Sequence, residues 1–351
     1  MAETQGSAHF LEGRDLSNGW KVLEKVPRSG GATGGMFSIG YVVEHADGRK
    51  GFLKALDFSE ALKDLRELQR LLQEYNFECD LLAKCRERRL TRVATALTQG
   101  KTTVDGYEPA ALADVHYVIF EFADGDIRSQ MERAHVVWCL TVLHNVAVGL
   151  RQLHTLGIAH QDVKPSNVLT FREFGSKIGD LGSAVDRTMI SPHDDEPVGG
   201  DPAYAPPEQL YRNLQGEWNR RRLATDMYLL GSLIMYMFTA VGTTAAVLSR
   251  MYAGLHYMFP DVTYENVMPH WRLAFEEVIE DFRIAVAAMS PENDYFAREL
   301  SVMLRELCDP DPALRGTPQS RGLTGGQYSL ERYVSRLDLM RLKAEIYIGR
   351  K

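Results

Sequence analysis

Cysteine is scarce in this sequence, and no apolar run is long enough to predict a membrane span. The four cysteines stand at positions 79, 85, 139 and 308, and none has the CxxC spacing of a metal or redox pair. We therefore expect reduced thiols rather than disulfides or metal ligands. The most apolar run, residues 229–241, is too short to cross a bilayer and is typical of a buried helix.

Positive charge is also in short supply. Lys and Arg number 40 against 47 Asp and Glu, which gives a net charge of −7 and argues against nucleic acid as the main partner. We interpret Arg220-Arg221-Arg222 as a solvated helix start rather than a docking patch. Residues 1–15 contain no apolar region typical of a secretory signal, so we expect a cytoplasmic protein with no membrane partner.

Length and composition are those of a globular protein. The 351 residues are 45% hydrophobic and 25% charged, enough for a large core and two structural units. Hydrophobic periodicity predicts a β-rich first part and a helical second part. The expected strands are 20–26, 39–45, 51–56, 93–97 and 116–122, and the expected helices are 59–75, 77–89, 136–156, 226–240, 271–289, 296–307 and 328–347.

The stretch His160-Gln161-Asp162-Val163-Lys164-Pro165-Ser166-Asn167 carries the chemistry. It places a carboxylate, an ammonium and a carboxamide within six residues, and Asp180 follows in a Gly-Asp-Leu-Gly segment. Phosphoryl transfer needs these groups: a base for the incoming hydroxyl, a cation for the phosphate and two oxygen ligands for Mg²⁺. Each residue alone would fit a loop cap, but the ordered set predicts phosphoryl transfer.

Together with Tyr204-Ala205-Pro206-Pro207-Glu208, this set resembles the signature of the protein kinase superfamily, in its Ser/Thr branch, over about residues 20–315. The resemblance implies an α+β, two-lobed fold with a small β-rich N-lobe and a larger helical C-lobe. The Pro-Pro-Glu ending looks like that of bacterial kinases of this superfamily. The domains we expect are a flexible lead (1–15), the N-lobe (16–122), the C-lobe (123–327) and a C-terminal helix (328–351).

The resemblance also implies the roles of the chemical groups. Asp162 would accept the proton of a protein Ser or Thr hydroxyl, and Lys164 would neutralise charge on the transferred group. Asn167 and Asp180 would hold Mg²⁺, with Mn²⁺ as the alternative ion, and ATP would be the phosphate donor. Lys54 resembles the strand lysine that binds the α- and β-phosphates.

Lys54 needs a carboxylate to fix its side chain. Glu78 is the predicted partner because it lies beside the apolar pair Leu81-Leu82 on a helical pattern. Glu74, one helical turn earlier, would share the same face and stays the alternative.

The rest of the nucleotide site departs in part from the family pattern. Counting back from Lys54, only Gly34 of the three usual loop glycines is kept, although Gly31 and Gly35 supply freedom for backbone N–H groups to approach phosphate. The other contacts implied for ATP are Ile39 over the adenine, the Glu121 carbonyl and Ala123 amide at its edge, Phe120 as a bulky gatekeeper and Asp126 at the ribose.

Two substitutions distinguish this chain from its family. Gln161 replaces the arginine that normally clamps a phosphate on the activation segment, so we expect a kinase of the non-RD type. Thr188 and Ser191 stay open as phosphosites, although their acidic neighbours would repel a phosphate. Leu181 replaces the phenylalanine of the Asp-Phe-Gly motif. Structural roles are implied for His160, Leu181, Asp226 as anchor of the catalytic loop, and Glu208 paired with Arg315.

Two other functions stay open. A pseudokinase that binds nucleotide as a scaffold is favoured by the degenerate glycine loop and opposed by the intact Lys54, Asp162, Lys164, Asn167 and Asp180. A small-molecule kinase would share the carboxylates but would not explain residues 200–208. The sequence leaves open the physiological substrate, the activating signal and the oligomeric state.

Overall fold

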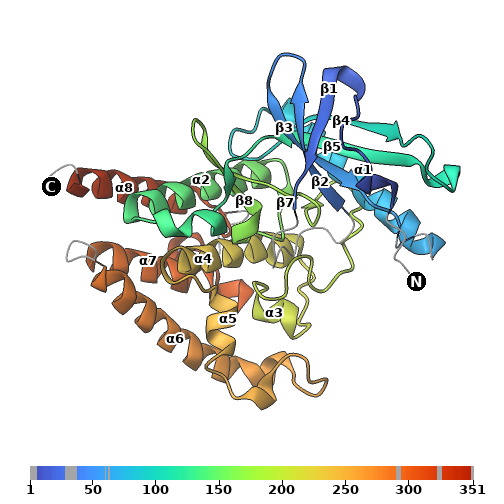
Figure 1. The fold of residues 1–351 in the computed structure, drawn as a ribbon. Coiled ribbons are helices and arrows are strands. Elements are labelled where there is room, and N and C mark those ends of the chain that lie inside the picture. Colours follow the sequence, from blue (N-terminus) through green and yellow to red (C-terminus); the bar gives the residue numbers. More distant parts are fainter. Residues whose placement is uncertain are drawn as a thin grey trace. The chain divides into compact units, whose positions relative to one another are not determined.

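The computed structural model describes residues 6–27, 38–59, 61, 64–289, 294–321 and 326–348. The chain forms two compact units, a β-rich one and a mainly helical one (Figure 1). Unit 1 comprises residues 1–124 together with the short segment Gly179–Gly182, and unit 2 comprises residues 125–178 and 183–351. The α+β class with a β-sheet lobe and a helical lobe is confirmed, and the return of residues 179–182 to unit 1 was not predicted.

Unit 1 is built on one antiparallel sheet in the order β1-β2-β3-β5-β4. Its elements are β1 (Trp20–Lys25), β2 (Ser38–His45), β3 (Lys50–Leu56), α1 (Leu65–Glu87), β4 (Ala96–Thr103) and β5 (Asp114–Glu121). The two helices predicted over residues 59–89 are one helix, α1, whose first turn is capped by the Asp64 carboxylate accepting from the Arg66 amide. The fourth strand starts at Ala96, three residues later than predicted.

The strands of this sheet present two different faces because side chains alternate along a strand. Leu53 and Ala55 of β3 point to a buried hydrophobic cluster on one face, which we call the outer face, together with Tyr41 and Tyr117. Lys54, between them, points to the opposite face. The sheet therefore separates a purely structural surface from the surface that bears the predicted phosphate-binding lysine.

Residues 6–19 cover the outer face of this sheet. Ala8, in a short 3₁₀ helix (Ser7–His9), and Leu11 are completely buried in the outer-face cluster, and the Tyr41 hydroxyl donates to the Ala8 carbonyl at 2.7 Å. The expectation of a flexible lead is therefore wrong for residues 6–15. Apolar side chains at positions 8, 11 and 16 bury against the sheet, and this contact holds the segment in place.

Unit 2 contains short β elements and the large helices. The strands are β6 (Gly125–Asp126), β7 (Ile158–Ala159), β8 (Val168–Phe171), β9 (Gly175–Ile178) and β10 (Val185–Asp186), and the helices are α2 (Val136–Thr155), α3 (Pro207–Leu210), α4 (Ala224–Thr239), α5 (Thr243–Leu248), α6 (Tyr264–Ala288), α7 (Asp294–Leu307) and α8 (Glu331–Ile348). Helix α6 begins seven residues before the predicted start at residue 271.

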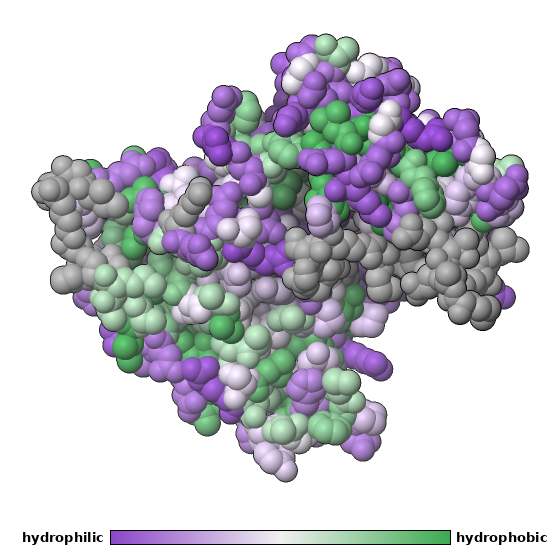
Figure 2. All heavy atoms as spheres, viewed as in Figure 1, coloured by the Kyte–Doolittle hydropathy of each residue, from purple (hydrophilic) through white to green (hydrophobic). Residues whose placement is uncertain are grey.

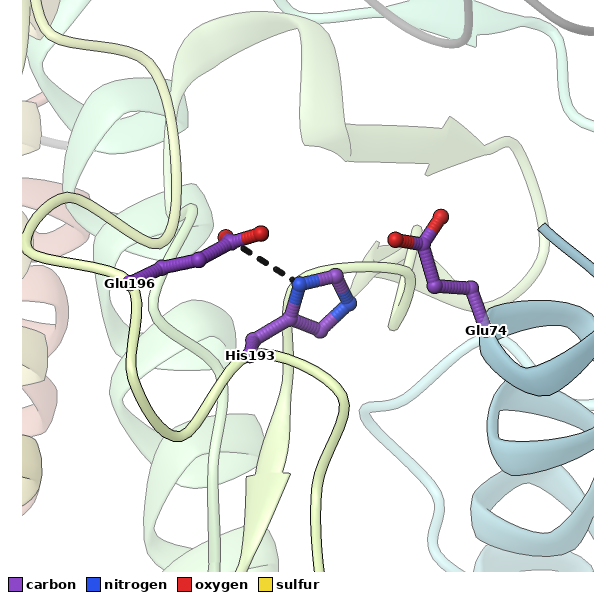
Figure 3. A group of neighbouring side chains, drawn as sticks. All are labelled: Glu74, His193 and Glu196. Carbon is purple, nitrogen blue, oxygen red and sulfur yellow. Dashed lines mark hydrogen bonds and ion pairs between the residues drawn. The ribbon is translucent and has the colours of Figure 1, made fainter. Parts of the chain in front are cut away.

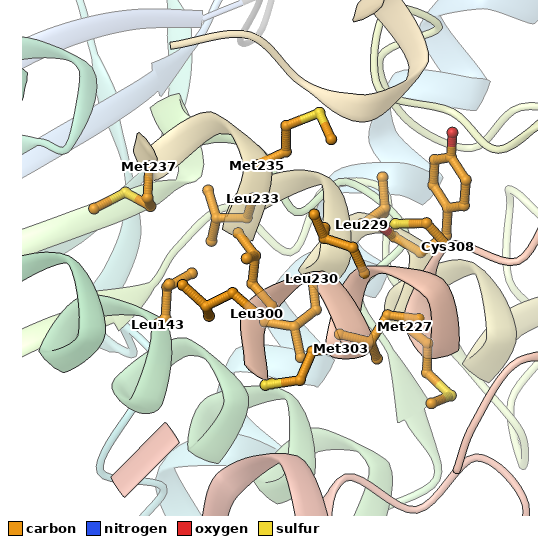
Figure 4. Close-up of a cluster of buried hydrophobic side chains, with 14 of the residues drawn as sticks. Leu143, Met227, Leu229, Leu230, Leu233, Met235, Met237, Leu300, Met303 and Cys308 are labelled. Carbon is orange, nitrogen blue, oxygen red and sulfur yellow. Dashed lines mark hydrogen bonds between the residues drawn. The ribbon is translucent and has the colours of Figure 1, made fainter. Parts of the chain in front are cut away.

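Helix α4 forms the centre of the unit 2 core. Its side chains are buried on nearly every face, and Leu230 and Leu233 meet Leu143 of α2 and Leu300 of α7 in one hydrophobic cluster (Figure 4). On the face shown in Figure 2, hydrophilic and hydrophobic residues are interspersed over the surface of both units. The apolar run at residues 229–241 is thus largely the core helix that its length predicted.

Two further helices belong to this core. Helix α8, predicted as a separate C-terminal element, packs along α2, and its Tyr333 and Leu337 are fully buried. It is therefore an integral part of unit 2.

Among the described residues, α2 alone is long and apolar enough to cross a membrane. In the protein, 56% of that stretch is buried, and core helices of this kind meet the same length and composition criteria.

The cover over the outer face predicts a stability effect. Replacing the buried Leu11 by Ala should lower the free energy of unfolding by about 2–5 kcal/mol, because it removes buried methyl groups and leaves a cavity. Its neighbour Phe10 is 49% exposed, so Phe10→Ala should change stability by less than about 1 kcal/mol. Urea unfolding of both variants checks this, and equal effects would contradict the described packing.

Candidate active site

Lys54, Glu78 and Asp180 come together within unit 1. Lys54 Nζ lies 3.2 Å from both carboxylate oxygens of Glu78 and 3.4 Å from Asp180 Oδ1. Glu78 lies on α1 and is buried, whereas Asp180 belongs to the segment that returns to unit 1. Of the two predicted partners, Glu78 makes the contact; Glu74 instead accepts a hydrogen bond from Arg70 Nη1 at 2.8 Å.

The charge of Lys54 is stabilised by its surroundings. Burial alone would lower the pKa of the ammonium, but the nearby Asp180 and Glu78 carboxylates outweigh burial and raise the Lys54 pKa above its ordinary value. The lysine is therefore a fixed cation at neutral pH. A permanently charged group held at a set position is suited to binding phosphate oxygens.

The face of the sheet that carries Lys54 differs from the prediction. Across the strands, Lys54 pairs with Gly40, whereas Ile39 pairs with Ala55 and lies in the outer-face cluster. The assignment of Ile39 to adenine is therefore wrong. The count along the sequence was one residue out of register, and a shift of one residue moves a side chain to the other face.

Phe52 lies on the same face of the sheet as Lys54, because the two residues are two positions apart on β3. Its Cα partner in β5 is Phe120, so the predicted gatekeeper lies on the same face as Lys54. A Cβ on Gly40 would lie 2.8 Å from the Phe52 ring, so a larger residue there would require the ring to move. The sequence reasoning missed Phe52 and Gly40; strand alternation from Lys54 is the signal that identifies them.

The remaining nucleotide contacts stay predictions. Gly31, Gly34 and Gly35 lie outside the described residues. Glu121 is the last residue of β5, and Ala123 follows it near the end of unit 1. In unit 2, Asp126 already accepts hydrogen bonds from the Ser129 amide at 2.9 Å and from Arg128 Nη2 at 3.0 Å.

Asp162, Lys164 and Asn167 form the corresponding cluster of unit 2. Asp162 Oδ2 lies 2.9 Å from Lys164 Nζ and accepts a hydrogen bond from Asn167 Nδ2 at 2.9 Å. The same Asn167 amide donates to the Asp162 carbonyl at 2.9 Å, within a 3₁₀ turn that begins at Pro165. The Asp162 carboxylate is thus oriented by an ammonium and an amide, as a general base must be.

The segment Gly200-Asp201 approaches this cluster closely. The Asp201 amide donates to Asp162 Oδ1 at 2.9 Å, and Asp201 Oδ2 lies 3.6 Å from Lys164 Nζ. A Cβ on Gly200 would lie 2.6 Å from Asp162 Oδ1 and from the Gln161 carbonyl, so this approach requires glycine. Asp201 therefore contacts the predicted catalytic residues through both its backbone and its side chain.

Asp226 anchors the loop that precedes Asp162. Its carboxylate is completely buried and accepts the backbone amides of His160 and Gln161, each at 2.8 Å. His154 Nε2 lies 2.8 Å from the same carboxylate. Burial alone would raise the Asp226 pKa, but the His154 hydrogen bond, the charges of His154 and His160 and the Gln161 amide lower it below the ordinary value.

Glu208 and Arg315 form the ion pair implied by the resemblance. Arg315 Nη1 and Nη2 donate to the two Glu208 oxygens at 2.6 and 2.7 Å, and both side chains are buried. Arg315 also donates to the backbone carbonyls of Ala224 and Asp309. These bonds engage each side-chain nitrogen of Arg315 and both Glu208 oxygens, which makes the pair a rigid link between α3, α4 and the turn before Arg315.

Arg222 is a buried cation near the predicted catalytic loop that the sequence reasoning missed. Arg220 is exposed as predicted, but Arg222 is only 2% exposed, so the interpretation of a wholly solvated run is wrong. Burial, followed by the charge of Arg221, lowers the pKa of Arg222 to about 10. Arg222 stands one helical turn before Asp226, and this i, i+4 spacing is the signal that would have placed it on the buried face.

The two predicted metal ligands belong to different units, and each carries oxygen donors of a kind that suits a hard divalent cation. Asn167 directs its Nδ2 to Asp162, its Oδ1 accepts a hydrogen bond from Ser166 Oγ at 3.4 Å, and Asp180 carries carboxylate oxygens. Carboxylate and carboxamide oxygens are the ligands that Mg²⁺ prefers in proteins. His160 and Leu181, the two residues with predicted structural roles, are both buried, and His160 Nδ1 accepts from the Asp162 amide at 3.3 Å.

Comparison with known proteins agrees with this chemistry. The model of the protein kinase domain matches residues 33–321. The chain is 27% identical over 219 residues to serine/threonine-protein kinase PTK2/STK2 of Saccharomyces cerevisiae, a match covering 57% of this chain and 26% of that protein. It is 28% identical over 212 residues to serine/threonine-protein kinase Pkn1 of Myxococcus xanthus, covering 54% and 28%.

A third relative is named as an inactive kinase. The chain is 33% identical over 122 residues to the inactive serine/threonine-protein kinase PLK5 of mouse, a match covering 34% of this chain and 19% of that protein. The chain thus spans less than a third of the length of each of these three relatives.

The lowered pKa of Asp226 predicts a pH-dependent contribution to stability. Asp226→Asn should lower the free energy of unfolding at pH 7 by about 2–3 kcal/mol, because hydrogen bonds to a buried charge are lost. A carboxylate with a depressed folded-state pKa stabilises above its unfolded value of 3.8, and this contribution disappears on protonation at lower pH. The difference between wild type and variant should therefore shrink below that pH.

Urea unfolding at a series of pH values measures this difference. The exposed Asp195 supplies the control, since Asp195→Asn should leave stability within about 0.5 kcal/mol of wild type. A difference for Asp226→Asn that stays constant from neutral to strongly acidic pH would refute the assigned role of its charge.

Proposed function

Because the chain belongs to the protein kinase family, we propose that it transfers the γ-phosphate of Mg-ATP to serine and threonine hydroxyls of protein substrates. The observation that carries this proposal is the contact of Lys54 with both Glu78 and Asp180. A lysine fixed by two carboxylates is arranged to bind phosphate, and no purely structural role requires it on this face of the sheet. The yeast and bacterial relatives named as Ser/Thr kinases support the choice of acceptor.

The residues of unit 2 have separate tasks in this proposal. Asp162 accepts the proton of the acceptor hydroxyl, since its carboxylate is held by Lys164 and Asn167. Lys164 offsets negative charge on the group being transferred. The segment Gly200-Asp201 keeps Asp162 in place through the Asp201 amide.

The residues of the chain that would hold the metal are Asn167 and Asp180. The bound ion, Mg²⁺ or Mn²⁺, would supply positive charge to offset that of the ATP phosphates. Lys54 complements this charge from the protein side, and Glu78 keeps its ammonium oriented.

Two finer features belong to the proposal. The neutral Gln161 beside Asp162 supports a kinase of the non-RD type, since this position carries no charge for a phosphate. A cytoplasmic location is supported by the cysteines, because all four are buried free thiols, as expected in a reducing compartment.

A nucleotide-binding scaffold without catalysis is the second candidate, favoured by the similarity to the inactive mouse relative. The intact bonding of Asp162 to Lys164 and Asn167 opposes it, since a scaffold needs no oriented base.

Removing the base separates these two functions. Asp162→Asn should lower the rate of phosphate transfer from radiolabelled ATP to a generic basic protein by about 10²–10⁴-fold, because the hydroxyl proton loses its acceptor. Nucleotide binding, followed with a fluorescent ATP analogue, should persist. Wild type that binds the analogue but labels no protein would instead contradict the proposed protein kinase activity.

The partner of Lys54 is testable with a matched pair of variants. Glu78→Gln should lower kcat/KM for ATP by about 10–100-fold, the value of a lost hydrogen bond between charged groups. Glu74→Gln, one turn away on α1, should leave kcat/KM close to wild type because Glu74 bonds to Arg70. Steady-state kinetics with varied ATP gives the comparison, and a larger loss for Glu74→Gln would reverse the assignment.

A further inference from the structure

The side chain of Gln161 is fully engaged inside unit 2. Its Nε2 donates to the Arg222 backbone carbonyl at 2.9 Å and to Asp226 Oδ1 at 3.0 Å. Arg222 Nη1 in turn donates to Gln161 Oε1 at 3.4 Å. Gln161, which precedes the proposed base Asp162, and Arg222 therefore hydrogen-bond to each other. Arg222 lies in the π-helical turn Asn219–Leu223.

The guanidinium of Arg222 also reaches a second segment, residues 191–196. Arg222 Nη2 donates to the backbone carbonyls of His193 at 3.1 Å and Asp194 at 2.9 Å. The neighbouring Arg221 Nη2 donates to the carbonyls of Asp194 at 2.6 Å and Glu196 at 3.3 Å. Two adjacent arginines thus bind this segment through its main chain, with charge-assisted hydrogen bonds.

Segment 191–196 is itself tightly folded. The Ser191 amide donates to Asp194 Oδ2 at 3.0 Å, and the His193 amide donates to Ser191 Oγ at 3.2 Å. His193 Nδ1 lies 3.2 Å from Glu196 Oε2, the contact drawn as a dashed line in Figure 3. The Ser191 hydroxyl is buried and already accepts a bond, so the segment reaches this conformation without any added group.

We propose that Arg222 is the positioning residue that ties the loop of Asp162 to segment 191–196 and keeps that segment ordered without phosphorylation. A phosphate switch needs arginine donors that stay unsatisfied until the phosphate arrives. Here the donors of Arg222 bond to carbonyls and to Gln161 in the unmodified chain. This inference rests on the proposed kinase function only where its effect is measured as kcat.

Arginine variants test this proposal on the full chain. Arg222→Met should lower kcat at least tenfold while the affinity for Mg-ADP stays unchanged, and hydrogen exchange of the amides in residues 191–196 should rise at least tenfold. Arg222→Lys keeps the charge but lacks the planar fork, so it should restore part of both losses. The exposed neighbour Arg220→Met is the matched control and should behave as wild type.

Measurements on the wild type secure the test where a variant fails to fold. The amides of His193, Asp194 and Glu196, which donate within the segment, should exchange slowly, and phosphatase-treated protein of verified mass should keep its activity. Fast exchange at these amides, a tenfold loss after phosphatase, or wild-type kcat and exchange in Arg222→Met would each overturn the proposal. Wild type that transfers no phosphate but shows slow exchange, which is lost in Arg222→Met and partly kept in Arg222→Lys, would reject the kinase function and retain the tie.

Discussion

The buried carboxylate of Asp226 is the constraint on which the chemistry of unit 2 depends. Gln161 adopts a left-handed backbone conformation with φ of 66°, which is unfavourable for a residue with a side chain. The two amides that Asp226 accepts, from His160 and Gln161, hold the loop in this conformation. Asp162 follows directly, so the direction of its carboxylate depends on the buried Asp226 that holds the two preceding residues.

Each unit contains one ammonium between two carboxylates. In unit 1 Lys54 lies between Glu78 and Asp180, and in unit 2 Lys164 lies between Asp162 and Asp201. Each set therefore carries one excess negative charge, which favours a cation and repels a bare phosphate. The ion pairs also set each side chain in place before any ligand binds.

Residues fixed by a local motif could be predicted from the sequence, and residues fixed by register or by distant packing could not. Glu78 was identified because helical spacing relates it to its apolar neighbours. Ile39 was misplaced because its face depends on the pairing of β2 with β3, which the sequence alone does not fix to within one residue. Arg222 and the cover formed by residues 6–19 were missed since charge and position in the chain suggested solvent, whereas tertiary contacts bury them.

The covered outer face of the sheet affects how an isolated catalytic domain can be prepared. A truncated protein that starts where the family match begins, at residue 33, would lack both β1 and the segment that covers Tyr41 and Tyr117. Its β2 edge and two aromatic rings would face water, and such surfaces promote aggregation. Inactivity of that shortened protein would report damage to the scaffold and would say nothing about the competence of its catalytic groups.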